Sequence, residues 1–216
     1  KYYTLEEYKK QIEENQKNKD GRLVYLYATN ADEQYSNIEN AKSKGYNVLL
    51  LDGILDAHFI STLEQKYGDC QFARVDSASI DKLIEKEEES KESKLNDEQK
   101  ESVKKAFEEI IDKTSFIVEF SNLSETDAPV EVIQNEFMRR MKEMSAMNGM
   151  SMWGGMPDSY TLMLNANNPV IAGLVDKNEE EQKNTIKQLY DLARLSKNLL
   201  KGKDLNEFVK RSFNEI

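Results

Sequence analysis

The chain has 216 residues, enough for one large domain or two small ones, and either arrangement can bury an apolar core. Its 30 basic and 40 acidic residues give a net charge of −10, which argues against a DNA or RNA partner because nucleic-acid binding depends on basic surfaces. The longest apolar run, Leu23 to Ala28, is too short to cross a membrane, and the acidic charge opposes binding to anionic lipids.

The start of the chain predicts a helix. Thr4 and Glu7 have the spacing of a capping box, and apolar residues follow them at helical intervals. Because the chain begins at Lys1 and opens directly on this helix, we expect it to be part of a longer protein. No secretory signal precedes the helix, and the single cysteine, Cys70, cannot form an internal disulfide, so we expect a cytoplasmic protein.

Three short apolar blocks predict buried strands. They cover residues 23–28, 46–51 and 70–75. The two segments between them have helical spacing and end at Gly45 and Gly68, as helices often do. Alternating strands and helices imply right-handed crossovers with helices over the sheet. Residues 1–84 are therefore predicted to form an α/β three-layer subdomain with a small parallel sheet.

Residues 85–112 are predicted to form a charged connector and a linking helix. Between Glu85 and Glu101, eight acidic and four basic residues accompany one apolar residue, Leu95, so this stretch can add little to a core. Because both charge signs are interspersed, a solvated connector is favoured over an acidic binding tail. Asn96 and Gln99 have the spacing of a second capping box, and an apolar stripe typical of an amphipathic helix begins after them.

Residues 113–216 are predicted to form an α+β domain that ends in a helical hairpin. Strands are expected at 116–120, 130–133 and 160–164, and helices at about 135–148, 179–201 and 204–216. Each of the last two helices carries an apolar stripe about 140° wide, which the hairpin cannot bury alone. A second copy related by two-fold symmetry would complete a four-helix bundle, so a homodimer is predicted. The alternative is that both helices pack entirely on their own domain. The predicted dimer contacts are Leu189, Leu192, Leu199, Leu200, Leu205, Phe208, Val209 and Phe213.

All eight methionines lie between Met138 and Met163, a clustering that a single core cannot absorb. Methionine is flexible and polarizable, and suits surfaces that accept varied apolar partners. The residues predicted to bind such partners are Phe137, Met138, Met141, Met144 and Trp153. The alternative is core filling followed by a disordered loop.

No catalytic, cofactor-binding or metal-binding residue is predicted. One histidine, His58, and one cysteine cannot build a metal cluster of these types. Asp56, His58 and Ser61 are close in sequence, but helical spacing points them in different directions. The turn at 28–32 after the first strand lacks the glycine of a phosphate loop. A nucleotide- or flavin-binding α/β enzyme fragment remains the alternative function.

Several segments together resemble the bacterial HtpG chaperones, the prokaryotic ninety-kilodalton heat-shock family. The resemblance covers nearly the whole chain and is carried by the order and spacing of four segments. These are residues 25–29 (YLYAT), 44–51 (KGYNVLLL), 137–142 (FMRRMK) and 164–169 (LNANNP).

The resemblance implies that residues up to about 84 close the middle domain and that residues from about 113 form the dimerisation domain. It implies that ATP and Mg are bound and ATP is hydrolysed by an N-terminal domain outside this chain, so the chain itself is not an enzyme and holds no cofactor. The helix with Phe137, Met141 and Met144 would contact non-native clients. Some relatives have Trp or Tyr at a client-contacting position where this chain has His58. The C-terminus lacks the acidic pentapeptide that binds helical-repeat co-chaperones, so that partner is not expected.

Overall fold

The structure is a computed structural model that describes residues 3–53, 55–78, 80–84, 92–134, 139–140 and 159–214. The chain divides into two compact units. The first comprises Lys1–Glu89 with Gln134–Met156, and the second comprises Ser90–Ile133 with Pro157–Ile216. Each unit has a three-stranded sheet and its own buried apolar residues, which are the elements of an independently stable body.

The sheet of the first unit is parallel, with the strand order β2-β1-β3. Its strands are β1 (Leu23–Ala28), β2 (Val48–Leu50) and β3 (Cys70–Arg74). Every residue of the central strand β1 is buried, which is typical of a parallel strand with helices on both faces. The predicted α/β fold with a small parallel sheet is confirmed.

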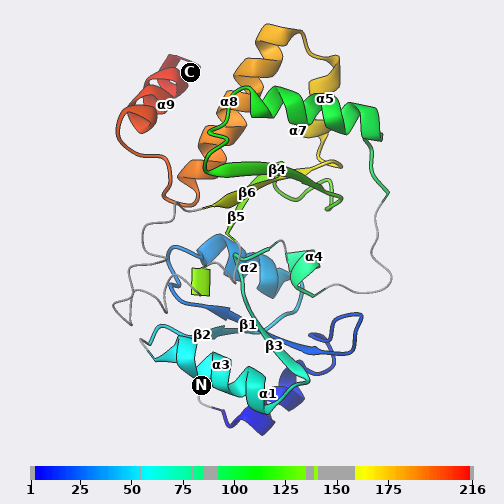
Figure 1. The fold of residues 1–216 in the computed structure, drawn as a ribbon, viewed down its shortest axis with the longest axis vertical. Helices are drawn as coiled ribbons and strands as arrows, with labels where there is room; N and C mark the ends of the chain where they lie inside the picture. The colour runs from blue at the N-terminus through cyan, green and yellow to red at the C-terminus, as the bar shows by residue number, and fades with distance from the viewer. Residues whose placement is uncertain are drawn as a thin grey trace. The chain divides into compact units, whose positions relative to one another are not determined.

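Helices cover both faces of this sheet (Figure 1). They are α1 (Leu5–Ile12), α2 (Tyr35–Ser43), α3 (Asp56–Lys66) and α4 (Ile80–Leu83). Alternate residues of β1 enter two different clusters, because successive side chains of a strand point to opposite faces. Tyr25 and Tyr27 pack with residues of α1 and α3, whereas Val24 and Leu26 pack with a residue of α2.

Both predicted capping boxes are present. The Thr4 hydroxyl accepts a hydrogen bond from the Glu7 amide at 3.3 Å, and the Glu7 carboxylate accepts one from the Thr4 amide at 2.8 Å. The second of these bonds is the main reason why the pKa of Glu7 lies below its ordinary value. Asn96 and Gln99 form the same reciprocal pair at the start of α5 (Asp97–Glu108). These local signals fix where the two helices begin.

The sheet of the second unit has the order β4-β6-β5, and β4 and β6 are parallel. Its strands are β4 (Phe116–Ser121), β5 (Val130–Gln134) and β6 (Tyr160–Asn165), all at the predicted positions. The remaining elements are α7 (Pro169–Ala172), η1 (Gly173–Asp176), α8 (Glu179–Leu195) and α9 (Gly202–Asn214).

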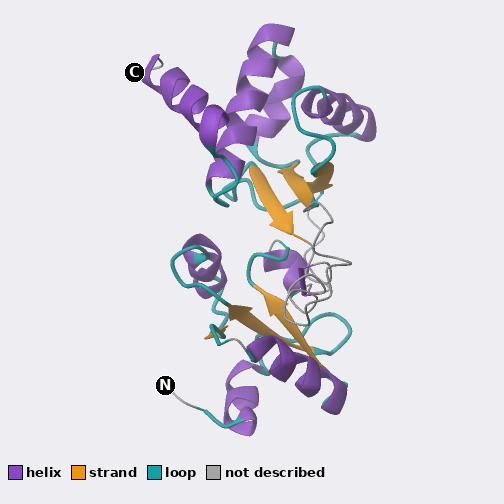
Figure 2. Ribbon diagram, turned by 60° about the vertical axis from the view of Figure 1, so that its left-hand side comes forward, coloured by secondary structure: helices purple, strands orange, loops and turns teal. Residues whose placement is uncertain are grey.

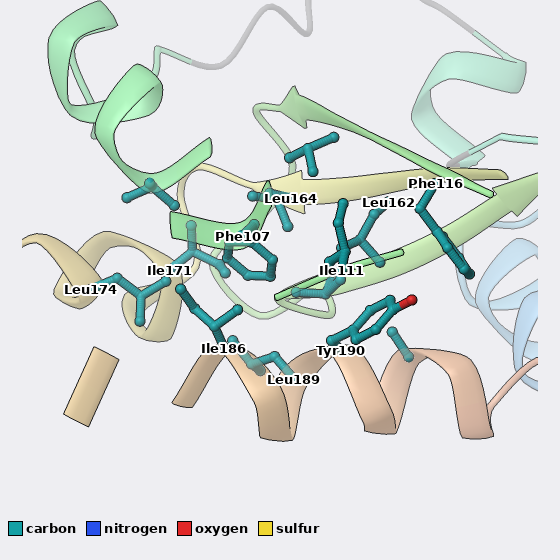
Figure 3. Close-up of a cluster of buried hydrophobic side chains, with 14 of the residues drawn as sticks. Phe107, Ile111, Phe116, Leu162, Leu164, Ile171, Leu174, Ile186, Leu189 and Tyr190 are labelled. Carbon is teal, nitrogen blue, oxygen red and sulfur yellow. The ribbon is translucent and has the colours of Figure 1, made fainter. Parts of the chain in front are cut away.

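The core of the second unit lies between the sheet and the helices α5 and α8 (Figure 3). Phe107 of α5 and Ile186 of α8 are fully buried there, together with Leu162 and Leu164 of β6. Residues 97–108, which the sequence assigns to a linking helix, thus supply apolar side chains to the core of the second unit.

The predicted helix 179–201 is too long, because α8 ends at Leu195. Asn198 adopts a left-handed conformation with φ of 56°, and the amide of Leu199 donates to the carbonyl of Arg194 at 2.9 Å. Asparagine tolerates this conformation better than most residues. Leu199 and Leu200 therefore follow the helix instead of extending its stripe.

We predict that Asn198→Ala lowers the free energy of unfolding by about 1 kcal/mol, because alanine is strained in the left-handed region. Asn198→Gly should leave that free energy within about 0.5 kcal/mol of the original, because glycine adopts positive φ without strain. Urea denaturation followed by circular dichroism measures both. Equal stabilities for the two variants would contradict the role of this residue in ending α8.

Candidate functional site

The helices α8 and α9 form the C-terminal hairpin of the second unit. Phe208 of α9 is buried, and Leu200 of the connecting turn is buried as well. Figure 2 shows α9 as a straight helix that extends away from the sheet toward the C-terminus. One face of α9 is therefore covered by its own chain, and the rest of the helix is open to solvent.

A buried ionic network holds the two helices of the hairpin together. Asp191 of α8, with a side chain only 8% exposed, forms ion pairs with Arg194 at 3.1 Å and with Arg211 of α9 at 2.9 Å. Arg194 also reaches Asp204 of α9 at 2.9 Å, and Arg211 donates to Gln188 at 3.0 Å. A buried charge is tolerated only with such partners, so this geometry is specific.

The same network acts on the pKa of Arg194. Burial alone would lower the pKa of its guanidinium, but the hydrogen bond to Asp204, the nearby Tyr190 and the charge of Asp191 raise that pKa above its ordinary value. The guanidinium also lies 4.6 Å from the centre of the Tyr190 ring, a favourable cation–π distance. The angle of α9 on α8 is thus set by charge as well as by apolar contact.

The structure separates the eight predicted dimer contacts into three groups. Leu189, Leu200 and Phe208 are buried within their own chain. Leu199 and Leu205 are half-buried. The exposed members are Leu192 at 45%, Val209 at 40% and Phe213 at 71% exposure. Leu195 of α8, at 39%, adds a further exposed apolar side chain to the hairpin. The hairpin therefore keeps apolar surface that its own chain does not cover.

The predicted client-binding residues Phe137, Met138, Met141, Met144 and Trp153 lie outside the described residues. Their assignment stays a prediction.

A second exposed apolar surface lies on α3 of the first unit. The buried residues of this helix are Ile60 and Leu63. Leu55 is 71% exposed and Phe59 is 49% exposed. The Phe59 amide donates to the Leu55 carbonyl, so the two residues are one helical turn apart on the same face, and the exposed His58 precedes Phe59. The helical spacing in the sequence identifies this pair, but it does not show that both side chains are exposed.

The turn after β1, where a doubly wound protein would bind phosphate, is occupied by the chain's own side chains. The Gln34 side-chain carbonyl accepts hydrogen bonds from the amides of Thr29 at 2.7 Å and of Asn30 at 3.0 Å. The side chain of Asn30 in turn accepts from the amides of Asp32 and Glu33. A phosphate would have to displace these bonds to reach the backbone donors.

Asp56 and Ser61, which are residue types found in hydrolase sites, form hydrogen bonds with different backbone groups and not with each other. Asp56 accepts from the Gly53 amide at 2.8 Å, and the Ser61 hydroxyl donates to the Ala57 carbonyl at 3.0 Å. Burial raises the pKa of the Cys70 thiol, which disfavours the reactive thiolate. Among the described residues, no group of three histidine, cysteine or acidic side chains is placed to bind a metal ion.

None of the helices in the described ranges combines the length and apolar character needed to cross a membrane.

Comparison with known proteins gives a consistent result. The family model described as Hsp90 protein matches residues 1–216. The chaperone protein HtpG of Bacteroides thetaiotaomicron is 39% identical over all of this chain and 42% of its own length. HtpG of Porphyromonas gingivalis is 42% identical over 87% of this chain and 28% of its own length. HtpG of Helicobacter acinonychis is 32% identical over 96% of this chain and 32% of its own length. The chain thus spans less than half the length of these curated relatives. With its full length matched, the chain belongs to the Hsp90 family, on its bacterial HtpG branch.

Proposed function

We propose that this chain is the part of a molecular chaperone that joins two copies of the protein and presents apolar surface to non-native proteins. The observation that carries the proposal is the hairpin α8–α9, which is held by a buried ionic network and yet leaves Val209 and Phe213 in solvent. A rigid helix with an uncovered apolar face is suited to a defined protein partner. The relatives named above are chaperones, which agrees with this function.

For dimerisation, a second copy of the hairpin is the simplest partner. Two-fold symmetry places the same surface on both copies, so Leu192, Val209 and Phe213 of one chain would meet the corresponding residues of the other. Leu189, Leu200 and Phe208 would act indirectly, by fixing the hairpin within each copy. A stable interface of this kind buries roughly 1,200 to 2,000 Å² in total.

For client binding, we assign two apolar surfaces. One is the methionine-rich segment with Phe137, Met141 and Met144, assigned from its sequence. The other is the pair formed by Leu55, the N-cap of α3, and Phe59 of α3, supported by their exposure. In this proposal the chain is not an enzyme, and the ATP and Mg of the chaperone cycle are bound by residues outside these 216.

We predict that Leu55→Ser with Phe59→Ser, and separately Met141→Ser with Met144→Ser, each weaken binding of a reduced, unfolded test protein. Losing two apolar contacts of this size should raise the Kd roughly ten-fold or more. Fluorescence anisotropy with a labelled unfolded protein measures the Kd. Tyr35→Ser is the control, because Tyr35 is an exposed aromatic of the first unit outside both surfaces. An unchanged Kd for either pair removes that surface from the proposal.

The competing function is a nucleotide- or flavin-binding α/β protein. The hydrogen bonds of Gln34 to the amides of Thr29 and Asn30 argue against it, because they use the donors that a phosphate would need. Calorimetric titration of the chain with ATP and with FMN separates the two functions. Tight stoichiometric binding of either ligand by these 216 residues would favour the competing function.

A further inference from the structure

Two adjacent arginines, Arg139 and Arg140, bind to the first unit through different groups. Arg139 is only 6% exposed, and its guanidinium donates to the Tyr27 hydroxyl at 2.8 Å. Arg140 donates from one guanidinium nitrogen to the Glu64 carboxylate at 2.9 Å and from another to the Phe72 carbonyl at 3.0 Å. Since a buried guanidinium is costly without acceptors, these bonds specify where the two residues lie.

Arg140 and Glu64 together occupy the open edge of the first sheet at Phe72. Among the strands that the structure describes, β3 is an edge strand in the order β2-β1-β3, so no described strand pairs with its outer main-chain groups. The amide of Phe72 donates to Glu64 at 2.8 Å, and its carbonyl accepts from Arg140. Both main-chain groups of Phe72 are therefore bound by one ion pair whose side chains are 17% and 28% exposed.

The two arginines contact the first unit although, in sequence, they lie between two strands of the second unit. Residues 139–140 lie between β5 and β6, which are neighbours in the sheet of the second unit. The segment Gln134–Met156 nevertheless belongs to the first unit. The chain thus leaves the second unit after β5, is bound to the first unit at Arg139 and Arg140, and returns for β6.

We propose that Arg139 and Arg140 are the anchor that holds the segment 134–156 on the first unit, with Tyr27, Glu64 and the Phe72 carbonyl as its receptors. The segment contains all but one of the eight methionines. If the function proposed above is correct, the anchor also sets where the client-binding residues that flank it in sequence are presented. The arginines are positioning residues in this scheme and do not themselves contact the client.

The test is hydrogen exchange of the whole 216-residue chain, read by mass spectrometry. Arg139→Met with Arg140→Met should speed exchange in peptides from 134–156 by roughly ten-fold or more, because charge-assisted hydrogen bonds are lost. Lys10→Met with Arg22→Met is the matched control, since it removes the same two positive charges from exposed positions of the same unit. Unchanged exchange in 134–156, or an equal rise in the control, overturns the anchor.

Two further measurements separate loss of the anchor from a wider destabilisation of the first unit. Should the double variant also lose protection in the β1 peptide 23–28, Arg140→Met alone is measured, because Arg140 is less buried than Arg139. A cycle with Glu64→Gln and Arg140→Gln then tests the pair itself. Non-additive effects on exchange in 134–156 support the anchor, and additive effects oppose it.

The client Kd of the same variants separates this inference from the proposed function. Faster exchange with a changed Kd supports both the anchor and its role in presentation. Faster exchange with an unchanged Kd keeps the anchor and removes only that role. If Met141→Ser with Met144→Ser also leaves the client Kd unchanged, the methionine-rich segment is not a client surface. The exchange result still shows whether the arginines anchor the segment.

Discussion

Replacing Val209 and Phe213 by aspartate should convert the proposed dimer into monomers. Both side chains are exposed on α9 and project from a helix whose other face is already packed, so a partner would bury them near the centre of the contact. Two buried charges without counter-ions would oppose association, and we expect self-association to weaken roughly 100-fold or more. Sedimentation velocity over a range of concentrations measures the change.

The choice of residues follows from the burial pattern. Phe208→Asp would bury a charge within the hairpin of a single copy, so loss of the dimer could not be separated from unfolding. Lys210→Asp is the control for the double variant, because it changes the net charge by the same two units at an exposed position of α9. A dimer that survives Val209→Asp with Phe213→Asp would place the contact between copies elsewhere.

Phe107→Ala should destabilise the second unit more than any surface substitution. The Phe107 ring is fully buried between α5 and the sheet, and removing such a ring costs about 3 to 5 kcal/mol. Domain stabilities are typically about 5 to 15 kcal/mol, so the second unit would be close to unfolding. Hydrogen exchange should rise in peptides of β4 and β6 and stay unchanged in β1.

Phe59→Ala is the matched control, since it removes the same ring from an exposed site and should change stability by less than about 1 kcal/mol. Differential scanning calorimetry follows both variants. If Phe107→Ala lowered the protection of β1 as much as that of β6, the two units would unfold as one cooperative body, and their separate cores would not be separately stable.

The elements that sequence predicted well are those with local signals. The capping boxes at Thr4 and Asn96 each involve a residue three positions away, and the short apolar strands are bounded by turns. The sequence predicts the end of α8 too late, because the apolar period continues to Leu200 while the left-handed residue Asn198 interrupts the helical backbone. A periodic pattern reports which side chains are apolar and does not report backbone conformation.

The candidate sites were harder to predict for a different reason. Helical spacing places Leu55 and Phe59 beside Ile60 and Leu63, but only tertiary packing decides which of them are covered. Likewise, the partners of Arg140 are 76 and 68 residues away in sequence. Among the eight predicted dimer contacts, spacing alone could not distinguish the buried Phe208 from the exposed Phe213.

The discontinuity of the first unit has a consequence for dividing this chain into pieces. A polypeptide that stopped at residue 89 would contain the whole sheet β2-β1-β3 but neither Arg139 nor Arg140. Glu64 would lose its counter-ion, and the Phe72 carbonyl on the edge strand would be free to pair with a neighbouring molecule. Cutting the chain in the charged stretch would therefore give a fragment that tends to associate through its edge strand. The first unit is complete only when the later residues Arg139 and Arg140 are also present.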